Sequence, residues 1–442
     1  MLLITLGYIF LGLSILVTEK VRIRNYGPDL FTFFIFMLVV QLVLPGAFLT
    51  AMKGFGEEID VGVPFFTNVL NDLGVYEATL TFVLLLLFVF CLYVFWAIIN
   101  NTVNLQRSSV SEIRISVSHL RWSLIMILGL IGMWVLVSEL GSYNNLVLFR
   151  IDRTRWNDNF VVANLFSSTM TFLMLSIVGV MIFWESKTSI KFLFSLACLV
   201  VFSIMTVSRR PFVIAPLLIF FTLVFNKNKI YINKKMFIIF LAIFIPIIIF
   251  GKSILWLLAH HSDITVAAIS SGNKDLLSGV TLIMSNIGIS TIESWATLLY
   301  LDIPMRFGVD HLLSIARRIP DGMLGLDIDF PERMVRISTK AFVGAGRQDI
   351  PPGFIGQMWL DFRLFGPVLS SMAFCFMISV LQILYNRVCK DRAAISLFVL
   401  LIYTISLPVR SGTLDFVFSV NVFLLIILMA FIVRIKIRKV VT

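Results

Sequence analysis

The sequence predicts an all-α polytopic membrane protein, with about eleven transmembrane helices in a single membrane domain, 1–442. The first observation is composition: 59% of the 442 residues are hydrophobic and only 14% are charged, with a mean hydropathy of +0.98. So little polar surface cannot cover a water-soluble domain of this size, so the surrounding solvent is lipid. The second is that the apolar stretches approach the length of a bilayer and are separated by polar connections.

The expected spans follow from windows of roughly 19 residues. The first, at 2–17, has no basic residue before it and no small-residue cleavage site after it, so it is expected to be a retained span. The full set is 2–17, 29–51, 77–99, 122–139, 161–184, 190–207, 211–225, 236–258, 364–385, 393–407 and 416–433. Three of them are short, so their ends are the least defined.

The orientation follows from basic residues in the connections, because Lys and Arg gather in cytoplasmic loops. Every connection after an odd-numbered span is basic, so the N-terminus is expected outside and the C-terminus in the cytoplasm. The residues concerned are Lys20, Arg22, Arg24, Arg107, Arg114, Arg121, Lys187, Lys191, Lys227, Lys229, Lys234, Lys235, Arg387, Lys390, Arg392, Arg434, Lys436, Arg438 and Lys439.

A large external loop, 259–363, is expected between spans eight and nine. Within it, the mostly uncharged stretch 276–300 could be counted as a twelfth span. A crossing there would turn the basic segments 387–392 and 434–439 outward, against the charge rule. We therefore interpret 276–300 as a re-entrant or interfacial helix. Loops of this length are uncommon unless they are functional, so the external face is where chemistry is expected.

Arginine dominates the basic residues that this topology places outside. Thirteen of the seventeen are arginines. The charge rule for membrane orientation does not distinguish lysine from arginine. The planar guanidinium of arginine is preferred where a phosphate or carboxylate is bound in a partly desolvated site. The set points to an anionic ligand presented from the outer leaflet. The alternative for any one arginine is a pairing with an external acid or a lipid headgroup.

Two short segments concentrate these arginines. In Ser208-Arg209-Arg210-Pro211, the proline favours a helix start whose free N–H groups would join the arginines in an anion site. The alternative is that the pair only anchors a tight hairpin. In the segment 150–156, Arg150, Arg153 and Arg155 precede Trp156, a set suited to a charged, sugar-bearing ligand or, equally, to an interfacial belt.

A third segment, 344–367, is rich in glycine and proline, which forbids a regular helix through 344–353 and indicates a shaped loop before a span. It contains Pro352-Gly-Phe-Ile-Gly356, followed by Phe362 and Gly366. A long external loop that ends in such a pattern resembles the O-antigen and capsule repeat-unit polymerases of the Wzy type. The stretch 208–213 is similar to the arginine-bearing segment of that family, and the spacing of Arg333 and Gly344 resembles a loop pattern of these polymerases.

The resemblance implies a metal-independent membrane glycosyltransferase, with a fold like the multi-span GT-C-like, lipid-phosphosugar-dependent transferases. It would transfer a growing glycan from undecaprenyl pyrophosphate to the non-reducing end of another lipid-linked repeat unit, at the periplasmic face of a bacterial inner membrane. The implied partners are that lipid-linked oligosaccharide, the bilayer and a chain-length-regulating co-polymerase, and no nucleic acid or cofactor is expected. Its expected catalytic residues are Arg209, Arg210, Arg347, Arg410 and His311, and its expected substrate-binding residues are Arg150, Arg153, Arg155, Arg333, Arg336 and Trp359.

A general base for the acceptor hydroxyl is also needed. The sequence leaves several external candidates open: His260, His261, Asp263, His311, Asp349, Asp361 and Asp415. Asp327 and Asp329 have the spacing of a metal-bound diphosphate site, but nucleotide sugars are not normally supplied outside. The four cysteines form no pair or cluster typical of a disulfide or metal site.

Two other functions compete with the polymerase. A ligase that transfers a finished glycan to lipid A core or protein would use the same chemistry, and a clear histidine-bearing catalytic loop would favour it. A flippase or transporter for lipid-linked sugars would have charged residues along its spans or an internal repeat. The apolar segments here are almost free of charge, so transport ranks third.

Overall fold

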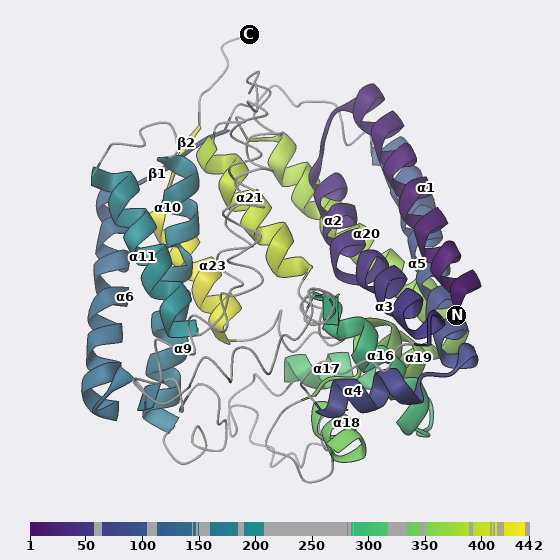
Figure 1. Cartoon of the computed structure of the whole chain (residues 1–442). Helices are drawn as coiled ribbons and strands as arrows, with labels where there is room; N and C mark the ends of the chain where they lie inside the picture. The colour runs from purple at the N-terminus through teal and green to yellow at the C-terminus, as the bar shows by residue number, and fades with distance from the viewer. Residues whose placement is uncertain are drawn as a thin grey trace. The chain divides into compact units, whose positions relative to one another are not determined.

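The computed structural model is mostly helical, as expected (Figure 1). It describes residues 1–56, 64–103, 113–143, 145–146, 149, 160–183, 190–206, 281, 284–285, 287–316, 334–343, 350–388, 392–406, 409, 412 and 420–437. Within these ranges six helices are long and apolar enough to cross a membrane: Leu2–Tyr26, Leu30–Gly54, Val75–Thr102, His119–Leu140, Val161–Ile182 and Phe354–Asn386. The expected spans 211–225 and 236–258 lie outside the described residues, and the count of eleven stays a prediction.

The chain divides into two compact units. Unit 1 comprises Met1–Arg107, Asp275–Ile383 and Ile402–Ser419; unit 2 comprises Ser108–Lys274, Leu384–Leu401 and Val420–Thr442. This division by contacts does not test the prediction of a single membrane domain.

Unit 1 is a bundle of helices with a cluster of short helices at one end. The bundle comprises α1 (Leu2–Tyr26), α2 (Leu30–Leu38), the π-helix η1 (Val39–Val43), α3 (Leu44–Gly54), α5 (Val75–Val103) and α20 (Gly366–Asn386), to which α21 (Arg392–Ile405) adds its last residues. The short elements are α4 (Pro64–Asp72), α16 (Ile289–Tyr300), α17 (Val309–Ala316), α18 (Met334–Val343), α19 (Phe354–Phe362) and the 3₁₀ turn η2 (Arg363–Phe365). Figure 1 shows them gathered at the Met1 end of α1.

Local chemistry explains where the first helices end and bend. Gly27, at φ 80°, ends α1, and Asp29 caps α2 by accepting from Thr32 N at 2.9 Å. The π-helix directly precedes Pro45, which has no N–H and whose ring would clash with the carbonyl four residues earlier. The wider π turn relieves that clash, so a single expected span is built from three helical pieces.

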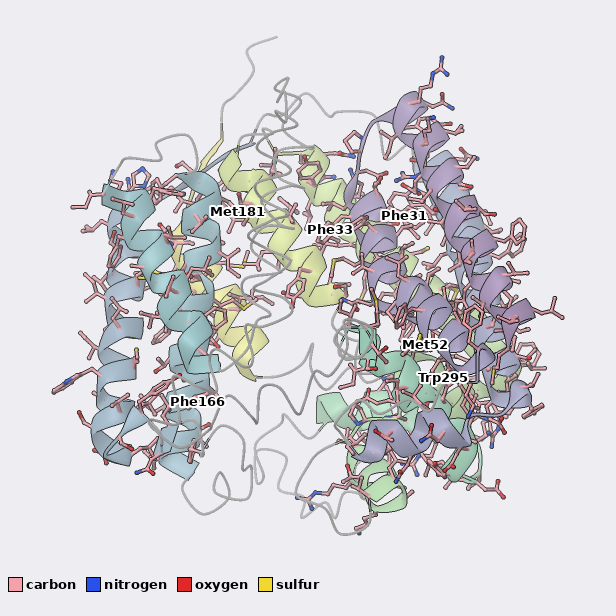
Figure 2. All side chains as sticks on the ribbon, viewed as in Figure 1. Phe31, Phe33, Met52, Phe166, Met181 and Trp295 are labelled. Carbon is pink, nitrogen blue, oxygen red and sulfur yellow. The ribbon has the colours of Figure 1, made fainter. Side chains whose placement is uncertain are left out.

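An aromatic cluster ties the short helices to the bundle. Phe88 of α5 lies 5.0 Å from Phe354, the first residue of α19, and Phe374 of α20 lies 5.7 Å from Phe354, measured between ring centroids. The Phe34 ring of α2 lies 5.1 Å from Phe374 in a tilted arrangement. All four rings are buried, as is Trp295 of α16, which Figure 2 shows within unit 1. Their burial fixes the start of α19 against α5 and α20, and α2 joins the cluster through Phe374.

At the opposite end of α1, a buried ionic network joins three helices. The Arg22 guanidinium binds Glu19 (Nη2–Oε2, 2.7 Å) and Asp29 (Nη2–Oδ1, 2.8 Å), and it also contacts the Thr32 hydroxyl. Tyr93 of α5 donates to Glu19 Oε1 at 2.9 Å. The two carboxylates find hydrogen-bond partners within the protein, from the Arg22 guanidinium and the Tyr93 hydroxyl, so α1 continues as a helix past its apolar stretch to Tyr26.

Unit 2 contains α6 (His119–Leu140), α9 (Phe160–Met174), α10 (Ser176–Ile182), α11 (Ile190–Thr206) and α23 (Val420–Ile432), with the first part of α21. Trp122 of α6 donates to the Leu175 carbonyl at 3.1 Å, at the turn between α9 and α10. A methyl group added at Gly179 would meet the Trp122 ring at 2.2 Å, so only glycine allows this approach. Phe166 and Met181, labelled in Figure 2, are buried in this unit.

A two-stranded antiparallel sheet adds to the expected all-α fold. Strand β1 (Ile113–Val117) pairs with β2 (Val433–Ile437), with Val117 opposite Val433 and Ile113 opposite Ile437. β1 leads into α6 and β2 follows α23 directly. Both strands alternate β-branched with polar residues, the period of a sheet with two different faces. The charge rule assigns both segments to the same side, and their pairing places them at the same end of unit 2.

Candidate functional site

Most of the expected site residues lie outside the described part of the chain. These are Arg150, Arg153, Arg155, Arg209, Arg210, Arg333, Arg347 and Arg410. The structure describes His311, Arg336 and Trp359, all in the short-helix cluster of unit 1. These three residues and the groups that touch them form the described part of the candidate site.

The glycine-rich motif docks on α16. The Pro352 carbonyl accepts from the Thr297 hydroxyl at 2.7 Å, and Phe354 N donates to the Ser290 hydroxyl at 2.8 Å. Gly353 has φ 73°, and a methyl group there would lie 2.3 Å from the Ser290 carbonyl oxygen, so both backbone conformation and space require glycine. Gly412 in turn packs on Gly353, since a methyl group at Gly412 would meet the Gly353 carbonyl at 2.2 Å.

The segment before α17 is fixed on the other end of α19. Arg306 N donates to the Leu360 carbonyl and Phe307 N donates to the Asp361 carbonyl, each at 2.9 Å. These carbonyls have no partner within their own helix end, so the segment caps α19. Phe307 and Gly308 both have positive φ, 52° and 71°, which turns the chain into α17. For Phe307 this conformation is uncommon, and such strain gathers at functional sites.

This docking brings His311 to Asp361. His311 Nε2 lies 2.9 Å from Asp361 Oδ2, and the Asp361 side chain is only 3% exposed. Gln357, one helical turn earlier on α19, donates through Nε2 to Asp361 Oδ1 at 3.0 Å. A buried carboxylate that accepts from Nε2–H leaves the lone pair of a neutral imidazole on Nδ1. His311 Nδ1 is buried and has no hydrogen-bond partner in the part of the chain that the structure describes.

A second ion pair stands next to the first. Arg306 donates to Asp310 through Nε at 3.0 Å and Nη2 at 2.8 Å. The hydrogen bonds that Arg306 donates to Asp310 raise the pKa of the guanidinium, and the charge of Asp361 also contributes. Arg306 therefore brings positive charge close to the Asp361 carboxylate without hydrogen bonding to it, and Asp310 holds it in a fixed bidentate geometry.

Trp359 is covered on one face by Arg363. The Arg363 Cζ lies 4.9 Å from the centre of the Trp359 ring, and its Nη2 donates to the Ile303 carbonyl at 2.7 Å. Arg363 has φ 51°, the second non-glycine residue with positive φ in the described chain. The guanidinium and the ring form one amphipathic surface that combines positive charge with an aromatic face.

Arg336 stands apart from this group. It is exposed on α18, and its helix is held by Ile350: Ser338 donates to the Ile350 carbonyl at 2.5 Å, and Ile350 N donates to Thr339 at 2.7 Å. Phe342 of α18 lies against Tyr300, whose hydroxyl donates to Asp72 at 2.6 Å. Burial raises the pKa of this Tyr300 hydroxyl, with Asp72 adding to the effect.

The arrangement can abstract a proton and stabilise an anion. The histidine has one nitrogen oriented by a carboxylate and one left for a substrate, which is the geometry of a general base. Within the described ranges, no three His, Cys, Asp or Glu side chains come together as a metal site. Sequence reasoning included His311 and Asp361 among several bases without pairing them. The four-residue spacing of Gln357 and Asp361, which places both on one helix face, was the missed signal.

Comparison of this chain with protein families, with curated proteins and with solved structures finds no match.

Proposed function

We propose that this chain is a membrane glycosyltransferase that polymerises lipid-linked oligosaccharide repeat units in O-antigen, capsule or exopolysaccharide biosynthesis. It would act at the periplasmic face of a bacterial inner membrane. The observation that carries the proposal is the His311–Asp361 pair, in which Asp361 lies on α19, the helix that begins within the polymerase-like motif Pro352–Gly356. The proposal combines that geometry with the family resemblance of the sequence.

In the proposed reaction, His311 Nδ1 takes the proton from the acceptor hydroxyl of one lipid-linked repeat unit. The acceptor oxygen forms the new bond to the anomeric carbon of the growing glycan as the bond from that carbon to undecaprenyl pyrophosphate breaks. Asp361 keeps the imidazole in the required tautomer and balances the charge of the imidazolium. Gln357 and Arg306 are positioning residues for that carboxylate.

The leaving pyrophosphate needs positive charge, which we assign to Arg209, Arg210, Arg347 and Arg410. Guanidinium groups aimed at the departing oxygens stabilise charge that develops in the transition state. Gly412, two residues after Arg410, packs on Gly353 at the start of α19, the helix that carries Asp361 in its last turn. Arg150, Arg153, Arg155, Arg333, Arg336 and Trp359 are proposed to bind the glycan and its diphosphate.

The test uses purified full-length protein in detergent with a synthetic undecaprenyl-pyrophosphate repeat unit, and a ladder of longer glycans is scored on gels. We expect His311→Gln and Asp361→Asn each to lower kcat roughly 10²- to 10⁴-fold, the usual contribution of a general base, with little change in KM. An asparagine amide would donate to Nε2, so the proton would sit on Nδ1 and the base would be lost. Asp302→Asn, which changes an exposed carboxylate in the same segment, is the matched control.

Retention of activity within about threefold by both variants would exclude His311 as the base. Arg210→Ala, folded as judged by thermal unfolding, is expected to abolish the ladder. A chelator should leave the rate unchanged.

The ligase remains the second candidate, because a paired histidine in the external loop is the feature that favours it. Wild-type protein that forms no ladder but transfers glycan to an added core-lipid acceptor would move the assignment to ligase. When both acceptors are offered together, the amount of glycan transferred to each gives the acceptor preference of the protein directly.

A further inference from the structure

One end of unit 2 carries positive charge that no carboxylate neutralises among the residues that the structure describes. The register of the β1–β2 sheet puts Arg114 opposite Lys436 and Ser116 opposite Arg434. Like charges placed directly across two strands destabilise a sheet. A two-stranded sheet is itself marginal in water, so this one needs a further source of stability.

Further basic groups surround the sheet. The charges of Lys191 and Arg434 both act on the His119 ring. Lys191 Nζ lies 6.0 Å and the His119 ring centre 5.3 Å from the centre of the Phe183 ring. Arg121 is exposed and donates to the Phe431 carbonyl at 2.9 Å. Among the residues that the structure describes, neither Lys191 nor Arg434 has a carboxylate within ion-pair distance.

Exposed apolar side chains lie between these charges. Leu120 is 76% exposed, Ile190 is 81% exposed and Ile435 is 64% exposed. Each is next to a basic residue in sequence. Strand β2 begins where α23 ends, and strand β1 ends just before α6, a helix long enough to span a membrane. A surface with both kinds of side chain at the end of a span lies at the boundary between acyl chains and headgroups.

We propose that β1, β2 and the adjoining ends of α6 and α11 form a binding surface for anionic phospholipid headgroups. We call it the basic ribbon: residues 113–121, 190–191 and 433–437. The apolar side chains enter the acyl boundary, and the headgroup phosphates neutralise Arg114, Lys191, Arg434 and Lys436. The lipid thereby removes the repulsion across the sheet and stabilises its pairing. This inference does not depend on the proposed function.

The test follows backbone amide hydrogen exchange in peptides covering 113–117 and 433–437, with the full chain in lipid nanodiscs. Each basic residue near an anionic surface contributes about a fivefold preference, so several together should slow exchange at least roughly tenfold when phosphatidylcholine is replaced by 30% phosphatidylglycerol. The variant Arg434→Gln/Lys436→Gln should lose this response. Lys20→Gln/Arg24→Gln removes the same charge from the last turns of α1, in the other unit, and should keep it.

Two more measurements keep the test decisive if the glutamine variant does not form the sheet. The charge-conserving Arg434→Lys/Lys436→Arg variant should respond like the wild type, and 0.5 M salt should abolish the wild-type response because screening shortens the reach of exposed charges. Equal exchange of the wild type in both lipids would overturn the proposal. A response that salt does not change would also overturn it. The same protection from 10 mM inorganic phosphate in phosphatidylcholine alone would overturn it too, because the ligand would then be a free anion instead of a lipid.

Discussion

Replacing Arg22 with alanine should strongly destabilise unit 1. The Arg22 side chain is about one-tenth exposed and holds two carboxylates, Glu19 and Asp29, that are buried to a similar degree. Breaking a buried pair costs roughly 3–5 kcal/mol, because the remaining charge has no compensation. Here Glu19 would keep its hydrogen bond from Tyr93 and Asp29 its bond from Thr32 N, so we expect about 3 kcal/mol.

The measurement is the free energy of unfolding in mixed micelles titrated with denaturing detergent. Arg24→Ala is the control, because this residue is exposed and only two positions from Arg22 in the same helix, and such surface changes stay within about 0.5 kcal/mol. Arg22→Lys should fall between the two, since an ammonium keeps the charge but cannot bind two carboxylates as a planar fork. A loss below about 1 kcal/mol for Arg22→Ala would refute the idea that the network stabilises the α1–α2 connection.

Two further substitutions test the packing that positions the site and unit 2. Gly353→Ala should lower the free energy of unfolding by more than about 2 kcal/mol and lower glycan synthesis, because its methyl group would meet the Ser290 carbonyl. Gly27→Ala is the control: Gly27 has a similar φ but open space around it, so the loss should be about 1 kcal/mol. Both values are measured by unfolding in denaturing detergent. Trp122→Phe should cost about 1–3 kcal/mol in the same assay, because it leaves the buried Leu175 carbonyl without this donor; an unchanged midpoint would argue against that hydrogen bond.

The helices near the N-terminus could be predicted closely and their ends could not. Hydropathy predicts a span at 77–99, and α5 covers Val75–Val103. It ends the first span at residue 17, whereas α1 continues to Tyr26, because Glu19 and Arg22 are buried in a network that composition cannot see. The sheet was missed although its alternation was present, because the two strands are short and far apart in sequence.

The site could be predicted in its parts but not in its pairings. His311 and Asp361 were both candidates by residue type and location. They are fifty residues apart in sequence, and they meet because Arg306 and Phe307 cap the end of α19, an arrangement that no local pattern encodes. The contact between Gln357 and Asp361 is local and could have been predicted, since one helical turn separates the two residues.

The pairing of β1 with β2 also constrains how the chain is made. Ser116 and its partner Arg434 are 318 residues apart, so at translation rates of 5–20 residues per second β1 waits roughly 15–60 s for its partner. During that time it is an unpaired edge, open to association with other chains. Its length of five residues and the charge of Arg114 are features that limit such association. The closure of this sheet is therefore a late event in biogenesis, and membrane insertion of the first spans must proceed without it.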